Sequence, residues 1–367
     1  MKFAVILVII IKVFNIYAIG GSRGSHGYGK WRKASKNGQT SESSADNPCN
    51  YTTLQKPDFS APERRISEVK CYEYIWEIKK REDKVKKEKE CFLWKISQPG
   101  HPKHHAIGGR ITKPGEFPHM GALGWRAAIG TWIFKCGSLL VSSKFLLTAA
   151  HCSQVPSRDT SVANTRPEIV RLGDKNIIDG FVNRLPPNDA KIKRIINHPN
   201  FNPPKKYFDI AIIEVTEDVK FTKYIQPACL WGHFDTRPLG NKATLTGWGV
   251  VETAGRKTSP ELQAAVVDIL DSNQCDHLLQ PYFNRLWCGL ESHQLCSGNL
   301  TGGVDACQGD SGGPLQVKIP LQVTSQGSMH YVIGVTSFGI GCALPNLPGI
   351  YTRVSSFIDW IEDVVWR

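Results

Sequence analysis

Three short segments of the chain carry the residue types that can make a serine nucleophilic. Ser311 lies in the run GDSGGP at 309–314, His151 lies in TAAHC at 148–152, and Asp209 precedes an apolar run. A serine hydroxyl is a weak nucleophile at neutral pH, so it needs an imidazole to accept its proton. The imidazole in turn needs a carboxylate to fix its tautomer. The order His, Asp, Ser matches a known arrangement of this triad, and the pattern predicts acyl transfer through Ser311.

These motifs resemble those of trypsin-like serine proteases with the chymotrypsin fold, and the resemblance extends from about Ala106 to Arg367. It implies an all-β fold of two six-stranded antiparallel β-barrels with a C-terminal helix, preceded by a partly disordered, partly helical pro-region. In this fold the first barrel supplies His151 as general base and Asp209 as orienting carboxylate, and the second supplies Ser311. The apolar stripe within 354–366 has the spacing of the expected C-terminal helix.

The resemblance also assigns roles to residues around the triad. The backbone N–H groups of Gly309 and Ser311 form the oxyanion hole, which stabilises developing negative charge. Asp305 lies at the base of the primary specificity pocket, where a buried carboxylate pairs with an Arg or Lys side chain and rejects neutral ones. Ser337 hydrogen-bonds to the far side of Asp209. The other substrate-binding residues are the apolar wall Phe338, where trypsin has Trp, the small residues Gly339 and Gly349, and the segment 337–339, an edge for the substrate backbone.

Activation is expected to follow the zymogen switch of the family, in which a new N-terminus pairs with Asp310. The register favours cleavage between His105 and Ala106, although AIGG stands at 106–109 where the family has Ile-Val-Gly-Gly. The small Ala side chain predicts a weakly anchored terminus and modest activity. Cleavage before Ile111 is the alternative.

Eleven cysteines, in a chain read as secreted, predict a disulfide framework with at least one unpaired thiol or interchain bond. The resemblance implies four bridges, of which the last would tether a cleaved pro-segment. We further expect Cys49 to pair with Cys71, which leaves Cys288 odd. The four implied bridges are Cys136–Cys152, Cys275–Cys296, Cys307–Cys342 and Cys91–Cys229.

The N-terminal region has a different composition from the rest of the chain. A charged start followed by a short apolar run predicts a signal peptide over residues 1–20, with a membrane anchor as the alternative. Residues 21–105 form the expected pro-region: disordered over 21–60, helical over 61–90 and a linker over 91–105. This region resembles that of snake-like insect proteases, but its three cysteines do not make a complete clip domain, which needs six.

The formal net charge is +12, yet the basic residues are dispersed, so we expect no nucleic-acid or membrane partner. The expected partners are protein substrates cut after Arg or Lys, an upstream activating protease and serpin-type inhibitors. Asn50 and Asn299 start glycosylation sequons. No cofactor or metal is expected. Calcium is the alternative, because Asp174 and Asp179 lie in a loop that binds calcium in some relatives of the family. However, Arg184 and Leu185 stand where a second acid would be needed.

Together these patterns favour a secreted zymogen of a serine endopeptidase acting in an extracellular cascade of immunity or development. Two rivals remain at this stage. A catalytically silent or weakly active homologue would act as a binding and regulatory scaffold, but such proteins usually lack the Ser or His that this chain retains. A digestive trypsin would not need the long, cysteine-bearing pro-region.

Overall fold

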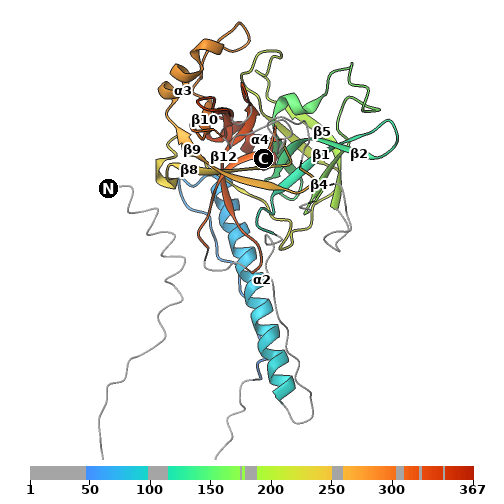
Figure 1. The fold of residues 1–367 in the computed structure, drawn as a ribbon. Coiled ribbons are helices and arrows are strands. Elements are labelled where there is room, and N and C mark those ends of the chain that lie inside the picture. The colour runs from blue at the N-terminus through green and yellow to red at the C-terminus, as the bar shows by residue number, and fades with distance from the viewer. Residues whose placement is uncertain are drawn as a thin grey trace, which may run out of the picture. The chain divides into compact units, whose positions relative to one another are not determined.

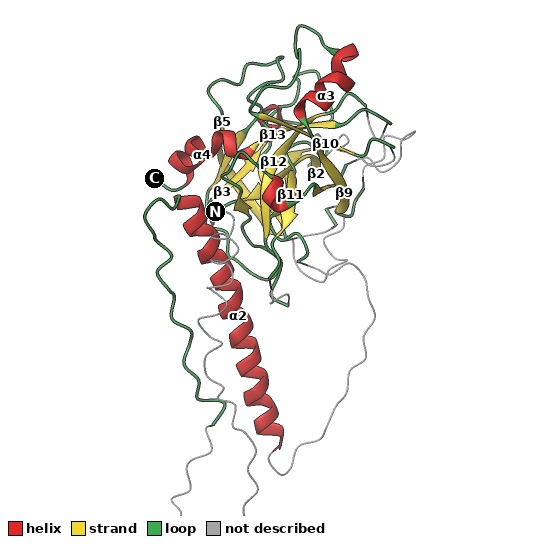
Figure 2. Ribbon diagram, turned by 90° about the vertical axis from the view of Figure 1, so that its left-hand side faces the viewer, coloured by secondary structure: helices red, strands yellow, loops and turns green. Residues whose placement is uncertain are grey.

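The computed structural model describes residues 47–97, 115–173, 176–177, 188–249, 259–302, 310–321, 325–341 and 344–367 (Figures 1 and 2). The expected signal peptide, residues 21–46 of the expected pro-region and the expected activation segment lie outside them. Strands dominate the described chain from residue 115 onward. No helix among the described residues is long and apolar enough to cross a membrane.

The first barrel is a closed antiparallel sheet with the strand order β1-β2-β3-β6-β5-β4. Alternate side chains of a closed sheet point inward and fill its centre. Leu139, Leu147 and Ile212 are accordingly inaccessible to solvent. The six strands are β1 (Met120–Arg126), β2 (Trp132–Leu140), β3 (Phe145–Thr148), β4 (Ile169–Leu172), β5 (Asn188–Asn197) and β6 (Ala211–Val215).

The second barrel has the order β11-β8-β9-β10-β13-β12, and the pairing of β11 with β12 closes it. The short β7 (Cys229–Leu230) adds to β12 in parallel. The expectation of two six-stranded antiparallel barrels is therefore confirmed. The strands of the second barrel are β8 (Lys242–Gly247), β9 (Gln263–Leu270), β10 (Gln294–Gly298), β11 (Pro314–Lys318), β12 (His330–Phe338) and β13 (Gly349–Arg353).

Two short helices follow strands of the second barrel in the sequence. Helix α3 (Ser272–Leu279) begins after Asp271, whose carboxylate accepts the backbone N–H groups of two residues of the first turn. Helix α4 (Ile358–Val365) is the expected C-terminal helix, and a 3₁₀ turn over Val354–Phe357 precedes it. Its buried apolar face packs into the core of the first barrel.

Helix α2 (Ile66–Ser97), in the expected pro-region, begins later than the predicted 61–90 and extends into the predicted linker. The buried face of α2 includes Cys71, Tyr74 and Ile78, which lie with Cys229 and Met329 in one apolar cluster. Ion pairs one turn apart, such as those of Lys84 and Lys87, support the exposed second half of the helix. Figure 2 shows the start of α2 beside α4.

An extended segment, residues 48–61, runs alongside α2 although sequence composition predicts disorder for residues 21–60. Lys56 forms an ion pair with Glu73, and Phe59 stacks on Tyr72. A disulfide joins Cys49 to Cys91. These contacts hold a polar segment that could not bury enough apolar surface by itself.

The disulfide pairing of the pro-region differs from the expectation. Cys49 pairs with Cys91, and Cys71 pairs with Cys229. The expected pairs Cys91–Cys229 and Cys49–Cys71 are therefore wrong. The reason is the continuous helix: the docked first half of α2 carries Cys71 to β7, while Cys91 lies about five and a half turns further along, beside the extended segment. Cys288 is an exposed free cysteine, as expected from the odd count.

Candidate active site

His151 lies on the 3₁₀ turn η1 (Ala150–Ser153), directly after β3. Its neighbour Cys152 forms a disulfide with Cys136 of β2, which fixes this turn against the barrel. The ring Nδ1 lies 2.7 Å from Oδ2 of Asp209, so an Nδ1–H tautomer can donate to that carboxylate. In this tautomer Nε2 has no proton and can accept one from a hydroxyl group.

Asp209 is almost fully buried, and each of its oxygens has a donor. Oδ1 accepts the backbone N–H of His151 at 2.9 Å, and Oδ2 accepts the Ser337 hydroxyl at 2.5 Å in addition to the imidazole. Burial by itself raises the pKa of this carboxyl, but the charge of His151 and the hydrogen bonds from His151 and Ser337 lower it below its ordinary value overall. Asp209 is therefore held as a carboxylate in a site with little access to water.

The direction of the Ser337 side chain depends on an irregularity in the sheet. The pairing of β12 with β13 shifts register between Thr336 and Phe338. Such a bulge reorients one side chain without ending the strand. Ser337 is buried at this position, and its hydroxyl points to Asp209 as the sequence resemblance implied. The neighbouring β13 also holds the aspartate, because the hydroxyl of Thr352 donates to the Asp209 carbonyl at 2.8 Å.

Ser311 occupies a tight turn, in which the N–H of Gly313 donates to the carbonyl of Asp310 at 2.9 Å. Gly312 has a φ of 80°, as the third residue of a type II turn requires. A Cβ atom at 312 would also lie 2.5 Å from the carbonyl oxygen of Gly137 and would clash with Thr148. The positive φ and the lack of space for a Cβ atom together explain why position 312 is a glycine.

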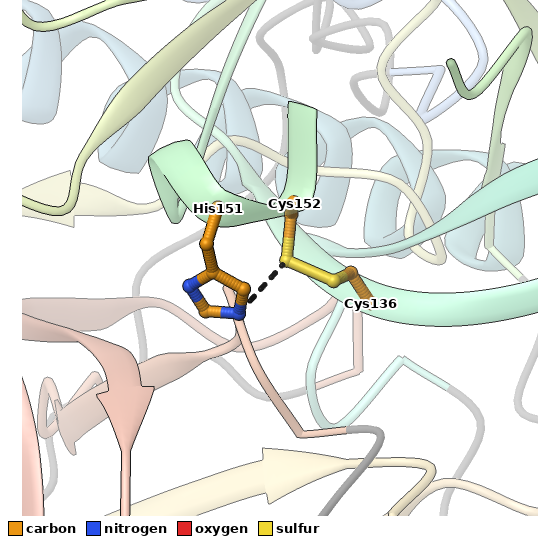
Figure 3. Close-up of side chains that lie close together, drawn as sticks. All are labelled: Cys136, His151 and Cys152. Atoms are coloured by element: carbon orange, nitrogen blue, oxygen red, sulfur yellow. Dashed lines mark hydrogen bonds between the residues drawn. A yellow bond between two sulfur atoms is a disulfide. The ribbon is translucent and has the colours of Figure 1, made fainter. Parts of the chain in front are cut away.

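The first barrel contacts the serine turn directly. The N–H of Gly137 donates to the carbonyl of Ser311 at 2.7 Å. The Cys152 sulfur lies 3.7 Å from that same carbonyl oxygen and 3.7 Å from Nε2 of His151, the contact drawn in Figure 3. Strands far apart in the sequence thus bring the backbone of Ser311 and the His151 ring to one sulfur atom.

Asp310 is buried next to the loop that follows β8. Its Oδ1 accepts the N–H of Gly249 at 2.9 Å. A Cβ atom on Gly249 would lie 2.6 Å from that oxygen, and one on Gly247 would lie 3.1 Å from the Asp310 Cα. The two glycines therefore leave the space that the Asp310 carboxylate occupies.

The substrate edge that sequence predicted is described in part. Phe338 is half-buried and its ring meets Trp287 edge-on at 5.5 Å, while Gly339 is exposed and Gly349 is buried at the start of β13. Several other predicted residues lie outside the described part of the chain. They are His105, Ala106, Asp305, Gly309 and the cysteines Cys307 and Cys342.

Sequence reasoning did not identify Phe208 and His293 as supports of the site. Phe208 precedes Asp209 and has a φ of 55°, a conformation that costs energy for an aromatic residue. The His293 ring stacks on Phe208 at 4.2 Å, and its Nε2 accepts the Phe208 N–H at 3.2 Å. Burial lowers the pKa of His293 more than the nearby Glu291 raises it, so the ring remains an acceptor. No sequence motif marks this pair.

The one group of three potential metal ligands among the described residues is Cys136, His151 and Cys152 (Figure 3). The two sulfur atoms are joined in a disulfide, so neither is available as a thiolate. This group is therefore not suited to hold a metal ion. The acidic residues considered for calcium, Asp174 and Asp179, lie outside the described residues.

Comparison with known proteins agrees with this arrangement. The family model described as Trypsin matches residues 106–361. The chain belongs to the trypsin family. Neuropsin, a serine protease expressed in the limbic system of mouse brain, has a solved structure that superposes with a TM-score of 0.53 and 26% identity. That comparison covers 68% of this chain and 96% of neuropsin.

Insect relatives of this trypsin-family protein are similar over more of the chain. Serine protease snk of Drosophila melanogaster is 36% identical over 83% of this chain and 66% of its own length. Serine protease Hayan, also from Drosophila melanogaster, is 39% identical, over 74% of this chain and 41% of its own length. Phenoloxidase-activating factor 3 of Holotrichia diomphalia is 32% identical over 71% of this chain and 72% of its own length. The matches therefore leave a third or more of the two Drosophila proteins uncovered.

Proposed function

We propose that this protein is a serine endopeptidase that hydrolyses peptide bonds after Arg or Lys. The observation that carries the proposal is the environment of Asp209, a buried carboxylate that accepts both His151 Nδ1 and Ser337 on one oxygen. An imidazole fixed in this way can take the proton of Ser311 and return it to the leaving amine. The rival reading as a silent scaffold has no support in this arrangement.

Specificity for basic residues is supported by the position of Asp305 in the sequence and by two glycines that the resemblance assigns to substrate binding. Asp305 precedes Ser311 by the same interval as in trypsin-like enzymes with basic specificity. Gly339 and Gly349 stand at positions that, by the resemblance, must stay small for a long basic side chain to enter the pocket. A carboxylate at the end of such a slot favours Arg and Lys because leaving it unpaired is costly.

The pro-region is consistent with a zymogen that remains tethered after cleavage. The Cys71–Cys229 disulfide joins α2 to β7 on either side of the expected cleavage site. Asp310 lies at the position where the new N-terminus would form an ion pair. An Ala terminus at 106 would lose about 2 kcal/mol of apolar anchoring relative to Ile. Cleavage between His105 and Ala106 would therefore produce a form of the protease that is only partly active.

The disulfides and the relatives support an extracellular role. Four disulfides among the described residues suit an oxidising compartment. Relatives that include a phenoloxidase-activating factor support a place in a proteolytic cascade, with an upstream activating protease and serpin-type inhibitors as partners. The sequon residue Asn50 is exposed and Asn299 is half-buried, and both remain candidate glycosylation sites.

Active-site labelling tests the enzymatic proposal directly. The protein, cleaved in its linker and correctly folded, is treated with an organophosphonate, and Ser311→Ala serves as the control. One label per molecule on Ser311, together with cleavage of Arg- and Lys-containing peptides, is expected. A folded, cleaved sample that takes up no label would favour the scaffold. N-terminal sequencing of the active form distinguishes Ala106 from Ile111, and Ala106→Ile should raise activity if cleavage occurs before Ala106.

A further inference from the structure

An exposed lysine lies over the aromatic wall next to the candidate active site. The Nζ atom of Lys206 is 5.6 Å from the centre of the Phe338 ring. Lys206 precedes Asp209 by three residues, and Phe338 directly follows Ser337. One positive charge from the first barrel thus lies over the aromatic ring of the second barrel that sequence assigns to substrate binding.

The buried side chain of Gln294 binds both the backbone of Lys206 and Trp287, the residue that contacts Phe338. The amide of Gln294 donates to the Lys206 carbonyl at 3.0 Å, and its oxygen accepts the indole N–H of Trp287 at 3.2 Å. Trp287 in turn contacts Phe338. The Lys206 N–H donates to the carbonyl of Leu286 at 3.1 Å. These bonds fix the point from which the lysine side chain extends.

The charge of Lys206 is not neutralised by the described part of the protein. In the described chain no carboxylate lies within ion-pairing distance of Lys206 or of Arg285, an exposed residue next to Leu286. By contrast, Lys193 and Arg194 on β5 both pair with Glu214. An exposed cation over an aromatic face is held weakly, so the Lys206 ammonium can turn towards an incoming carboxylate.

We propose that Lys206 selects substrates with Asp or Glu in the P2 to P4 positions, just before the basic P1 residue. This inference rests on the proposed function. A peptide that adds to the 337–339 edge with its P1 side chain in the pocket would lay its preceding residues along Phe338. An acidic side chain there would meet Lys206, with Arg285 adding charge of the same sign. A basic side chain would meet like charge and would be disfavoured.

Matched peptides test the proposal. The activated protein is assayed on peptides with Arg at P1 that carry Glu or the isosteric Gln at P2, P3 or P4 in turn. At one of these positions we expect kcat/KM to be about five-fold higher for Glu at low salt, the range of an exposed ion pair. The preference should weaken as sodium chloride screens the charges. Equal rates for Glu and Gln at all three positions would overturn the proposal.

Two variants of Lys206, and a control variant of a different lysine, complete the design. Lys206→Gln should bring the Glu-to-Gln ratio to about one, and Lys206→Glu should reverse it. Lys220→Gln, the same charge change at an exposed lysine after β6, should leave the ratio as in the wild type. A ratio that Lys206→Gln does not change would refute the role of Lys206 while leaving the protease intact. If the activated wild-type protein neither takes up the label on Ser311 nor cleaves any peptide, the proposed function itself would be refuted.

Discussion

Glu362 of α4 caps the N-terminus of the pro-region helix α2 through Ser67. Its Oε1 accepts both the backbone N–H of Ser67 at 3.1 Å and the Ser67 hydroxyl at 2.6 Å, and Oε2 lies 3.0 Å from Arg65. Ser67 and Glu362 are both buried. A carboxylate at a helix N-terminus satisfies free N–H groups and interacts well with the helix dipole. The last helix of the protease-like region thus stabilises the first turn of the pro-region.

Removal of this cap should loosen α2 from the protease-like region. Glu362→Ala leaves the buried N–H and hydroxyl of Ser67 without this acceptor and leaves Arg65 with Asp359 alone, and we expect it to cost about 3 kcal/mol of unfolding free energy. Glu362→Gln keeps one acceptor and should cost less. Asp363→Ala, which removes an exposed carboxylate from the same helix, should change stability by less than about 0.5 kcal/mol. Chemical denaturation would measure all three, and equal effects of Ala at 362 and 363 would contradict the cap.

The disulfide assignment can be tested by removing one cysteine at a time. After cleavage in the linker, Cys71→Ala should release the pro-region on a non-reducing gel, because no other described bridge joins it to the later chain. Cys91→Ala breaks only the bond to Cys49, so the cleaved chains should stay together. The reverse result would restore the pairing of Cys91 with Cys229 that sequence predicted.

The carboxylate of Asp209 should matter far more for catalysis than the hydrogen bond that Ser337 donates to it. Asp209→Asn places an N–H group or a neutral oxygen against Nδ1 and favours the wrong imidazole tautomer, so kcat should fall by about 10⁴-fold. Ser337→Ala removes one of three side-chain and backbone donors and should cost about 1.5 kcal/mol, roughly a tenfold loss. Peptide hydrolysis gives both values, with phosphonate labelling as a check on Ser311. A small effect of Asp209→Asn would remove it from the triad.

The glycine after the serine should tolerate no side chain, unlike a glycine with similar backbone angles elsewhere. Gly312→Ala combines a φ of 80° with a clash against Gly137 and Thr148, so loss of the serine turn and of labelling is expected. Gly130 has a φ of 87° and open space around its Cβ position, so Gly130→Ala should cost only about 1–2 kcal/mol of strain. Comparable activity of the two variants would contradict the close packing of the turn.

Two buried histidines should make stability fall as the solution becomes acidic. Burial lowers the pKa of His119 from 6.5 to about 4, only partly offset by Gln316, and that of the adjacent His330 is also lowered. Between pH 6.5 and 4 the unfolded chain therefore binds more protons than the folded one. The free energy of unfolding should drop by up to about 1.4 kcal/mol per pH unit for each histidine.

Denaturation of the inactive Ser311→Ala protein at several pH values measures this slope without self-digestion. His119→Phe in the same background should make the slope shallower within this window. Asp209 affects stability only at lower pH. Its pKa is lowered from 3.8 in the folded protein, so the stability that its carboxylate contributes is present above pH 3.8 and is lost as the pH falls below that value. An identical slope with and without His119 would show that this ring is not buried uncharged.

The sequence by itself determined the fold class. It also predicted the triad of His151, Asp209 and Ser311, because a glycine-flanked serine that occurs with these partner motifs has few other uses. The count of eleven cysteines also predicted an odd thiol, and the expected pairings left Cys288 as that residue. The length of α2 was missed because ion pairs and a disulfide, rather than apolar periodicity, stabilise its second half. Composition alone could not show that residues 48–60 have a partner to lie against.

Only the tertiary structure decided how the site is supported and how the pro-region is attached. The bulge that turns Ser337 to Asp209, the ring of His293 under Phe208 and the cap of Glu362 on Ser67 all join residues distant in sequence. Such contacts depend on which strands meet, and no local pattern encodes them. The cysteine pairing is of the same kind, because a bond forms between the cysteines that folding brings together. Spacing along the chain suggested Cys91 for Cys229, and the docked face of α2 supplied Cys71 instead.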